Sequence, residues 1–211
     1  WQAVASPAPA GDAGASPEAA RLHAKRDLPL RQIVALGVAR LIDHQDAAYA
    51  AQYRGWVESL AGMDGPAQEA TRTAARHLAL WMAYEDVIRV ADLKSRRSRF
   101  ERIRTEYRAA DHEPVVVRDF LKPGFDEIAA ILPPRLASLV RRHAERHGRR
   151  TLGDGLQLST SSVSGLLAMR ALAALRPLRR RSSRFLAQQA LMQRWVQALQ
   201  TALTLDRDEA K

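Results

Sequence analysis

A set of charged residues inside a strongly apolar stretch has types and spacing that could do chemistry: Glu85, Asp86, Arg89 and Asp92. On a helix, Arg89 would lie three or four residues from all three carboxylates. An active site built here would also need a nucleophile or proton acceptor facing a cleft. Because an unpaired ion in an apolar environment costs several kcal/mol, we interpret the group as an internal ion-pair network. Contact with a partner or substrate, and catalysis, are the alternatives.

A histidine pair, His143 and His147, has the i,i+4 spacing that can place two imidazoles on one metal ion. No third ligand is evident beside it. Arg141, Arg142 and Arg146 surround the pair with positive charge. Since arginines repel a cation, a solvated basic helix face is the simpler interpretation, and a metal site is the alternative.

A run of hydroxyl side chains at 159–162 precedes an apolar segment that should form a helix. Helix N-termini bind phosphate groups readily. The nearby Gly153-x-Gly155 is not a dinucleotide fingerprint, since no strand, glycine loop and helix surround it. Ser161 or Ser162 as the N-cap of the helix is the plainer interpretation.

Two arginine clusters contribute to a net charge of +10, which is unevenly distributed. Residues 1–132 hold 18 basic and 18 acidic residues, and residues 133–211 hold 15 and 5. Nucleic acid would bind such clusters through its phosphates, but single-strand binders also expose aromatic rings, and most aromatic residues here have core spacing. We therefore expect a solvated face or an acidic protein partner, with nucleic acid as the alternative. The candidate docking surface consists of Arg96, Arg97, Arg99, Arg179, Arg180, Arg181 and Arg184.

The composition excludes several classes of site and protein. The sequence contains no cysteine, so disulfides, thiol nucleophiles and cysteine-bound iron–sulfur clusters are excluded. No apolar run approaches the roughly 20 residues that span a bilayer. The first residues lack the basic start and apolar block of a signal peptide. We expect a protein with no membrane partner and no cofactor or metal bound by this chain.

The elements that must position these residues are mainly helices. We predict a mainly α fold, a multi-helix globular domain with one short two-stranded β-ladder between 115–118 and 156–160. Residues 1–28 should be a disordered linker, 29–205 a helical domain and 206–211 a frayed tail. The start at Trp1, in a Pro-, Ala- and Gly-rich stretch, suggests a piece that begins in a linker. Helices are expected over 30–60, 67–108, 125–132, 135–147, 163–175 and 178–203.

Three local features accompany these helices. An aromatic stripe with core spacing lies on one face of the first helix and consists of Tyr49, Tyr53, Trp56 and Leu60. In the second helix, Trp81, Met82 and Tyr84 are interpreted as core packing. Gly148 is expected to close the helix over 135–147 as its C-cap.

Two stretches carry a family resemblance. Tyr84–Lys94, followed by Arg96–Arg99 and Phe100, resembles the C-terminal region of the beta subunit of indolepyruvate:ferredoxin oxidoreductases, and Leu41–Tyr53 resembles the same region. The resemblance covers roughly residues 30–203. That family oxidatively decarboxylates aryl pyruvates to acyl-CoA, with thiamine diphosphate, coenzyme A and iron–sulfur clusters, and passes electrons to ferredoxin.

The resemblance implies a cytoplasmic, non-catalytic accessory domain, because nothing in this chain matches a motif for those cofactors. It would pack on the catalytic domain or subunit of the oxidoreductase and present its basic half to an acidic protein such as ferredoxin. The alternative function is a basic helical module that binds nucleic acid or protein. A small independent enzyme has less support, since we find no nucleophile–base arrangement.

Overall fold

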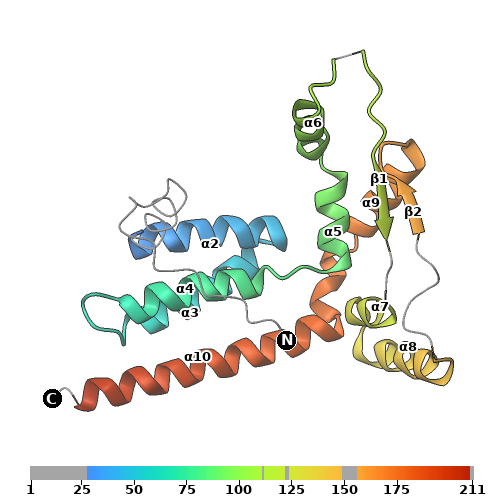
Figure 1. Cartoon of the computed structure of the whole chain (residues 1–211). Helices are drawn as coiled ribbons and strands as arrows, with labels where there is room; N and C mark the ends of the chain where they lie inside the picture. The colour runs from blue at the N-terminus through green and yellow to red at the C-terminus, as the bar shows by residue number, and fades with distance from the viewer. Residues whose placement is uncertain (1–27, 111, 122–123, 149–155, 210–211) are drawn as a thin grey trace, which may run out of the picture.

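The computed structural model describes residues 28–110, 112–121, 124–148 and 156–209, and it is mainly α-helical with one two-stranded antiparallel sheet, as predicted (Figure 1). A bundle is formed by α2 (Leu30–His44), α3 (Ala47–Ala61), α4 (Glu69–Met82) and α10 (Ser183–Glu209). A second lobe contains α5 (Val87–Ser95), α6 (Arg97–Glu106), β1 (Arg118–Leu121), α7 (Phe125–Ile131), α8 (Pro134–Arg146), β2 (Leu156–Ser159) and α9 (Val163–Ala173). The 3-10 helix η1 (Arg176–Arg181) connects α9 to α10.

The bundle core is built on an aromatic stripe that the sequence predicted on one helix face. Tyr49, Tyr53 and Leu60 are buried, and Trp56 is partly buried. The two phenols also satisfy backbone groups of the neighbouring region, since Tyr53 Oη donates to the carbonyl of Ala75 at 3.1 Å and Tyr49 Oη to that of Met82 at 3.2 Å. Helix α3 is thereby fastened to α4 by hydrogen bonds as well as by apolar contact.

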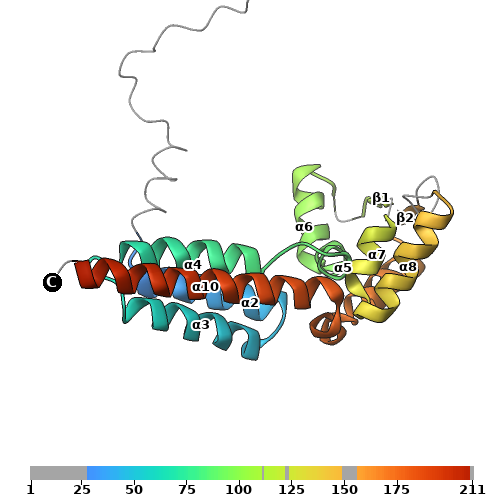
Figure 2. The same cartoon turned by 90° about the horizontal axis from the view of Figure 1, so that it is seen from below.

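Helix α10 joins the two parts of the molecule. It starts beside α7 in the second lobe and runs along the whole bundle (Figures 1 and 2). Phe185, Met192 and Val196 are its buried contributions to the bundle core. The helix was predicted to start near Leu178, but it begins at Ser183 because the hydroxyl of Ser182 accepts the amide of Phe185 as an N-cap.

Two predicted long helices are each broken by an aspartate. The predicted helix over 30–60 is two helices, and the amide of Tyr49 donates to Asp46 Oδ1 at 2.8 Å at the start of the second. The predicted helix over 67–108 is three helices, and Asp86 caps α5 by accepting the amide of Arg89 at 2.7 Å. In both places an aspartate side chain captures the amide three residues on, which starts a new helix.

The predicted β-ladder is present, with its first strand shifted by three residues. Arg118 pairs with Ser159, and Leu121 pairs with Leu156. The valines before β1 continue the contact, since Thr160 N donates to the carbonyl of Val117 at 3.0 Å. The second strand therefore lies within its predicted segment, whereas the first strand begins at Arg118, the last residue of the segment predicted for it.

Several local predictions are confirmed at the ends of helices. The amide of Gly165 donates to Ser162 Oγ, so Ser162 is the N-cap of α9. Gly148 has a φ of 60° after α8, as expected of a C-cap glycine. Helix α10 continues to Glu209 and so includes residues 206–209 of the tail 206–211 that was predicted to fray. Residues 1–27 of the predicted linker 1–28 and the pair Gly153-x-Gly155 lie outside the described residues, and Leu28 packs against the bundle core.

Helices α2 and α3 approach so closely at Gly37 that a larger residue would not fit there. A Cβ on Gly37 would lie 2.5 Å from Tyr53 Oη, whereas a Cβ on Gly55 would meet nothing within 4 Å. We expect Gly37→Ala to lower the free energy of unfolding by about 1–3 kcal/mol through overpacking. The control Gly55→Ala, also within a helix, should raise it by about 0.5–1 kcal/mol. Urea unfolding of both variants measures the difference, and equal effects would contradict this packing.

Candidate functional site

A buried arginine lies where the bundle meets the second lobe. Arg179 of η1 is 1% exposed and binds Asp86 through two hydrogen bonds, Nε to Oδ2 at 2.7 Å and Nη2 to Oδ1 at 3.0 Å. Its Nη1 donates to the carbonyl of His44 at 2.7 Å and to Oε1 of Gln45 at 2.9 Å. This junction network joins the end of α2, the start of α5 and η1. It is the type of fully hydrogen-bonded ion pair that a protein interior tolerates.

A second network surrounds Asp43 at the edge of the junction. Arg89 and Arg96 donate to Asp43 at 2.7 and 2.8 Å, and both arginines also contact Asp92. Burial by itself would raise the pKa of Asp43, but the hydrogen bonds from Arg96 and Arg89 outweigh it and leave the pKa below its usual value. The network is partly open to solvent, so we regard it as a clamp between α2 and the α5–α6 corner.

A third network holds the β-ladder against α5 and α6. Asp119 is buried and accepts hydrogen bonds from Lys94, from Arg99 at 3.0 Å and from the hydroxyl of Thr160 at 2.7 Å. Burial would raise the pKa of Asp119, but these donors outweigh it and the pKa is lowered. Both carboxylate oxygens of Asp119 therefore accept hydrogen bonds from groups within the fold.

The predicted charged group is therefore divided between networks. Asp86 belongs to the junction network, while Arg89 and Asp92 belong to the clamp on Asp43. Glu85 is exposed on the segment between α4 and α5. Its predicted helical pair with Arg89 is not formed, because α4 has ended before this residue.

The structure places the arginines of the predicted basic docking surface in different environments. Arg179 is buried, so its assignment to a surface is wrong. Arg96, Arg99 and Arg180 pair with Asp43, Asp119 and Asp46, respectively, and the guanidinium of Arg184 lies 4.8 Å from the ring centroid of Tyr84. Arg97 is exposed and pairs with Glu101 on its own helix, and Arg181 is exposed. Arginines close in sequence serve different partners because those partners come from distant segments.

The two other candidate sites are the histidine pair, which lacks a third ligand among the described residues, and the hydroxyl run, whose side chains have structural roles. His143 and His147 lie with ring centroids 4.5 Å apart, but the described residues contain no group of three or more metal-binding side chains. In the hydroxyl run, Thr160 binds Asp119, Ser161 Oγ accepts the amide of Val117, and Ser162 caps α9. None of these hydroxyl groups is arranged around a common anion position.

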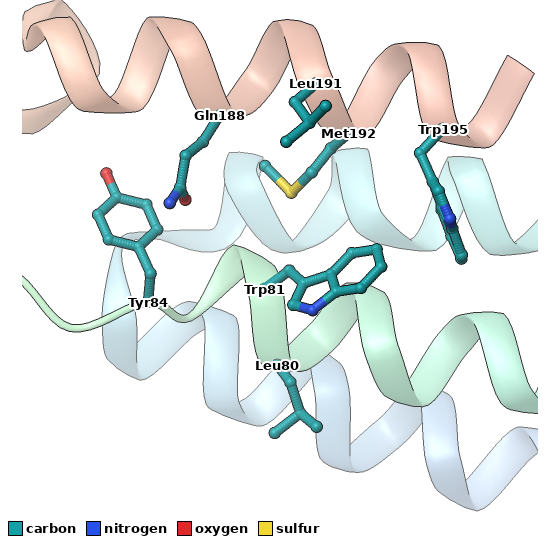
Figure 3. Close-up of a pocket in the computed structure, with 7 residues that line it drawn as sticks. All are labelled: Leu80, Trp81, Tyr84, Gln188, Leu191, Met192 and Trp195. Atoms are coloured by element: carbon teal, nitrogen blue, oxygen red, sulfur yellow. The ribbon is translucent and has the colours of Figure 1, made fainter.

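An apolar groove lies between α4 and α10 on the surface of the bundle (Figure 3). Its volume is about 400 Å³. The indoles of Trp81 and Trp195 meet edge to face with centroids 5.0 Å apart, and buried Met192 lies between the two helices. The lining side chains carry no charge: Leu80, Trp81, Tyr84, Gln188, Leu191, Met192 and Trp195.

The sequence did not predict this groove. Trp81, Met82 and Tyr84 were interpreted as core packing, and Met82 and Tyr84 are indeed buried, but Trp81 is 45% exposed. Leu191 of α10 is 60% exposed across the groove. The sequence feature that could have indicated the groove is the number of apolar residues around α4, which is larger than one buried helix face requires. The groove lacks a nucleophile–base pair, so its chemistry is that of binding.

Tyr84 closes one end of the groove and connects it to the junction. Its ring meets that of His44 edge to face at 5.4 Å, and burial, followed by the charge of Asp86, raises its pKa to about 12. Both ring nitrogens of His44 are buried and have no hydrogen-bond partner in the described part of the chain. Burial, followed by the charge of Arg179, lowers the pKa of His44 to about 4.

The junction network should be a main determinant of stability. Arg179→Met would leave the carboxylate of Asp86 buried and unpaired, so we expect the free energy of unfolding to fall by about 3–5 kcal/mol. Arg181→Met, an exposed arginine two residues further on, should change it by no more than about 0.5 kcal/mol. Urea unfolding at neutral pH tests both, and a loss below about 1 kcal/mol for Arg179→Met would contradict the role of the network.

The buried histidine should make stability depend on pH. The folded state keeps His44 neutral down to about pH 4, whereas the unfolded chain takes up the proton near its ordinary pKa of 6.5. The contribution of His44 to the free energy of unfolding is therefore fully present above pH 6.5. It is lost as the pH falls to about 4, by about 3 kcal/mol in total. His44→Phe should flatten the unfolding free energy in this window, and the control His77→Phe, at an exposed position, should not. An unchanged slope in His44→Phe would refute the assignment.

Comparisons with known proteins identify a family without naming an activity. No curated protein and no solved structure matches the chain. The model of a family of unknown function, DUF6537, matches residues 30–211. Because that match includes both the bundle and the second lobe, the chain belongs to DUF6537.

Proposed function

We propose that this chain is a non-catalytic accessory domain that packs against the catalytic domain or subunit of an indolepyruvate:ferredoxin oxidoreductase. The observation that carries the proposal is the uncharged aromatic groove between α4 and α10. Exposed tryptophan and leucine side chains around a preformed hollow are typical of the anchor regions of protein interfaces. The resemblance over Leu41–Tyr53 and Tyr84–Arg99 supplies the identity of the parent enzyme.

The residues of the resemblance have a clear structural role. Asp43 and Asp46 lie in the first stretch, and Asp86, Arg89 and Asp92 lie in the second. All five take part in ion pairs that hold the fold together. The shared residues therefore support a shared architecture, and the proposed activity belongs to the whole oxidoreductase.

The chemistry of that oxidoreductase is assigned to its other parts. The chain has no cysteine to bind an iron–sulfur cluster. The described residues contain no group of three or more side chains that could hold a metal ion. The proposal places the complex in the cytoplasm, and no helix in the described ranges is long and apolar enough to cross a membrane.

The groove favours a permanent apolar partner. Because its lining is uncharged, a charged partner segment would lose hydration there without gaining an ion pair. An apolar helix face of the catalytic subunit would bury Leu80, Trp81 and Leu191, which are exposed in the isolated chain. Such apolar contact is characteristic of interfaces between subunits that do not separate.

Co-purification of the full-length parent from its native cell tests the proposal. We expect a large subunit that carries iron and thiamine diphosphate to be recovered with it and identified by mass spectrometry. Leu191→Glu should abolish that recovery, because it places a charge in the groove. The matched control Leu36→Glu changes a similarly exposed leucine on α2, outside the groove, and should leave recovery intact.

Three results would contradict the proposal. Recovery of the parent alone would remove the evidence for the oxidoreductase. Recovery with nucleic acid that leaves at high salt would instead favour the basic nucleic-acid-binding module. Equal loss of the large subunit in Leu191→Glu and Leu36→Glu would mean that the groove is not the site where the large subunit binds.

A further inference from the structure

The outer face of α9 is apolar and uncovered. Helix α9 packs its inner face on α5 through residues that include buried Met169. On the opposite face, Val163 is 77% exposed and Leu167 is 59% exposed, and the alanines at 171 and 174 continue the same helical stripe in exposed positions. The stripe ends at η1, where Leu178 is also exposed.

This apolar stripe lies in a region that has no acidic side chain of its own. No Asp or Glu occurs between Asp154 and Asp206, whereas arginine occurs seven times in that interval. Arg179 is neutralised by Asp86 and Arg180 by Asp46, both from other elements. Arg170 on the stripe and Arg181 at its end are exposed and pair with no described carboxylate. The stripe is therefore bordered by uncompensated positive charge.

We propose that α9 and η1 form a docking surface for an acidic amphipathic helix of a partner protein. The apolar side of such a helix would cover Val163 and Leu167, and its carboxylates would bind Arg170 and Arg181. Guanidinium groups suit carboxylates because they donate two parallel hydrogen bonds. The small side chains at 171 and 174 would let the backbones of the two helices approach closely.

The composition of the surface favours a protein helix over the other anionic partners. Single-stranded nucleic acid is bound by arginine together with exposed aromatic rings, and 163–181 contains no aromatic residue. Interfacial membrane helices combine basic residues with large apolar or aromatic anchors, whereas much of this stripe is alanine. A narrow apolar stripe with arginines at its side and end matches the pattern of helix recognition.

This surface is separate from the groove in the bundle. The groove belongs to α4 and α10, and the docking surface belongs to the second lobe and the connection that follows it (Figure 1). The inference goes beyond the proposed function, since it does not depend on the parent enzyme. Its test uses the chain with synthetic probes, so its failure would leave the groove proposal standing.

Fluorescence anisotropy with a labelled helical peptide provides the test. The probe has about 16 residues, enough to span the length of α9, with leucines at three- and four-residue spacing and glutamates elsewhere. We expect the chain to bind it with a Kd on the order of micromolar. A peptide with lysine in place of glutamate, and one of the same composition with the helical spacing permuted, should both bind at least about tenfold more weakly.

Variants locate the binding surface. Leu167→Gln and Arg170→Glu should each weaken binding of the acidic peptide at least about tenfold. Leu36→Gln and Arg31→Glu change exposed residues on α2 and should leave binding unchanged. All four positions are exposed, so circular dichroism should show the same helix content for every variant.

Three outcomes would overturn the proposal. Equal affinity for the permuted acidic peptide would mean that the attraction is only that of net charge. Equal binding by the Leu167→Gln variant would mean that the stripe takes no part. Tighter binding of single-stranded DNA or of vesicles with anionic lipid, lost in the same variants, would assign the surface to a different class of partner.

Discussion

The buried pair of Arg179 and Asp86 is the interaction on which the rest of the structure depends. These residues are far apart in sequence and come from η1 and the segment before α5. The guanidinium also holds the last carbonyl of α2, where the helix dipole favours a cation. Removing either charge would leave the other buried and uncompensated. The pair therefore fixes the geometry of the junction more strictly than apolar contact could.

The position of α10 follows from that junction. Helix α10 begins two residues after η1 ends, capped by Ser182, and then supplies Phe185, Met192 and Val196 to the bundle core. The same path brings Leu191 and Trp195 beside Trp81, which creates the groove. Through Tyr84, whose ring lies against both His44 and Arg184, the groove and the ion pairs are in direct physical contact.

The excess positive charge of the chain has two different uses. Most of the arginines that the sequence singled out balance carboxylates within the fold, at Asp43, Asp46, Asp86 and Asp119. Other arginines, among them Arg170 and Arg181, are exposed beside an apolar stripe. This division explains why the two candidate binding surfaces differ in chemistry. The groove is uncharged, and the α9–η1 surface is apolar and cationic.

The sequence by itself determined the local features of this protein: its helical character, the aromatic stripe of Tyr49 and Tyr53, the β-ladder, and the caps at Gly148 and Ser162. These depend on interactions within a few residues or on a single periodic face. Tertiary structure decided the partners of the charges and the faces left uncovered. Arg89 lies three residues from Asp86, yet Asp86 pairs with Arg179, because a buried carboxylate is best satisfied by a fully buried guanidinium. Trp81 is exposed because no other described helix covers the α4–α10 groove, which helix periodicity cannot show.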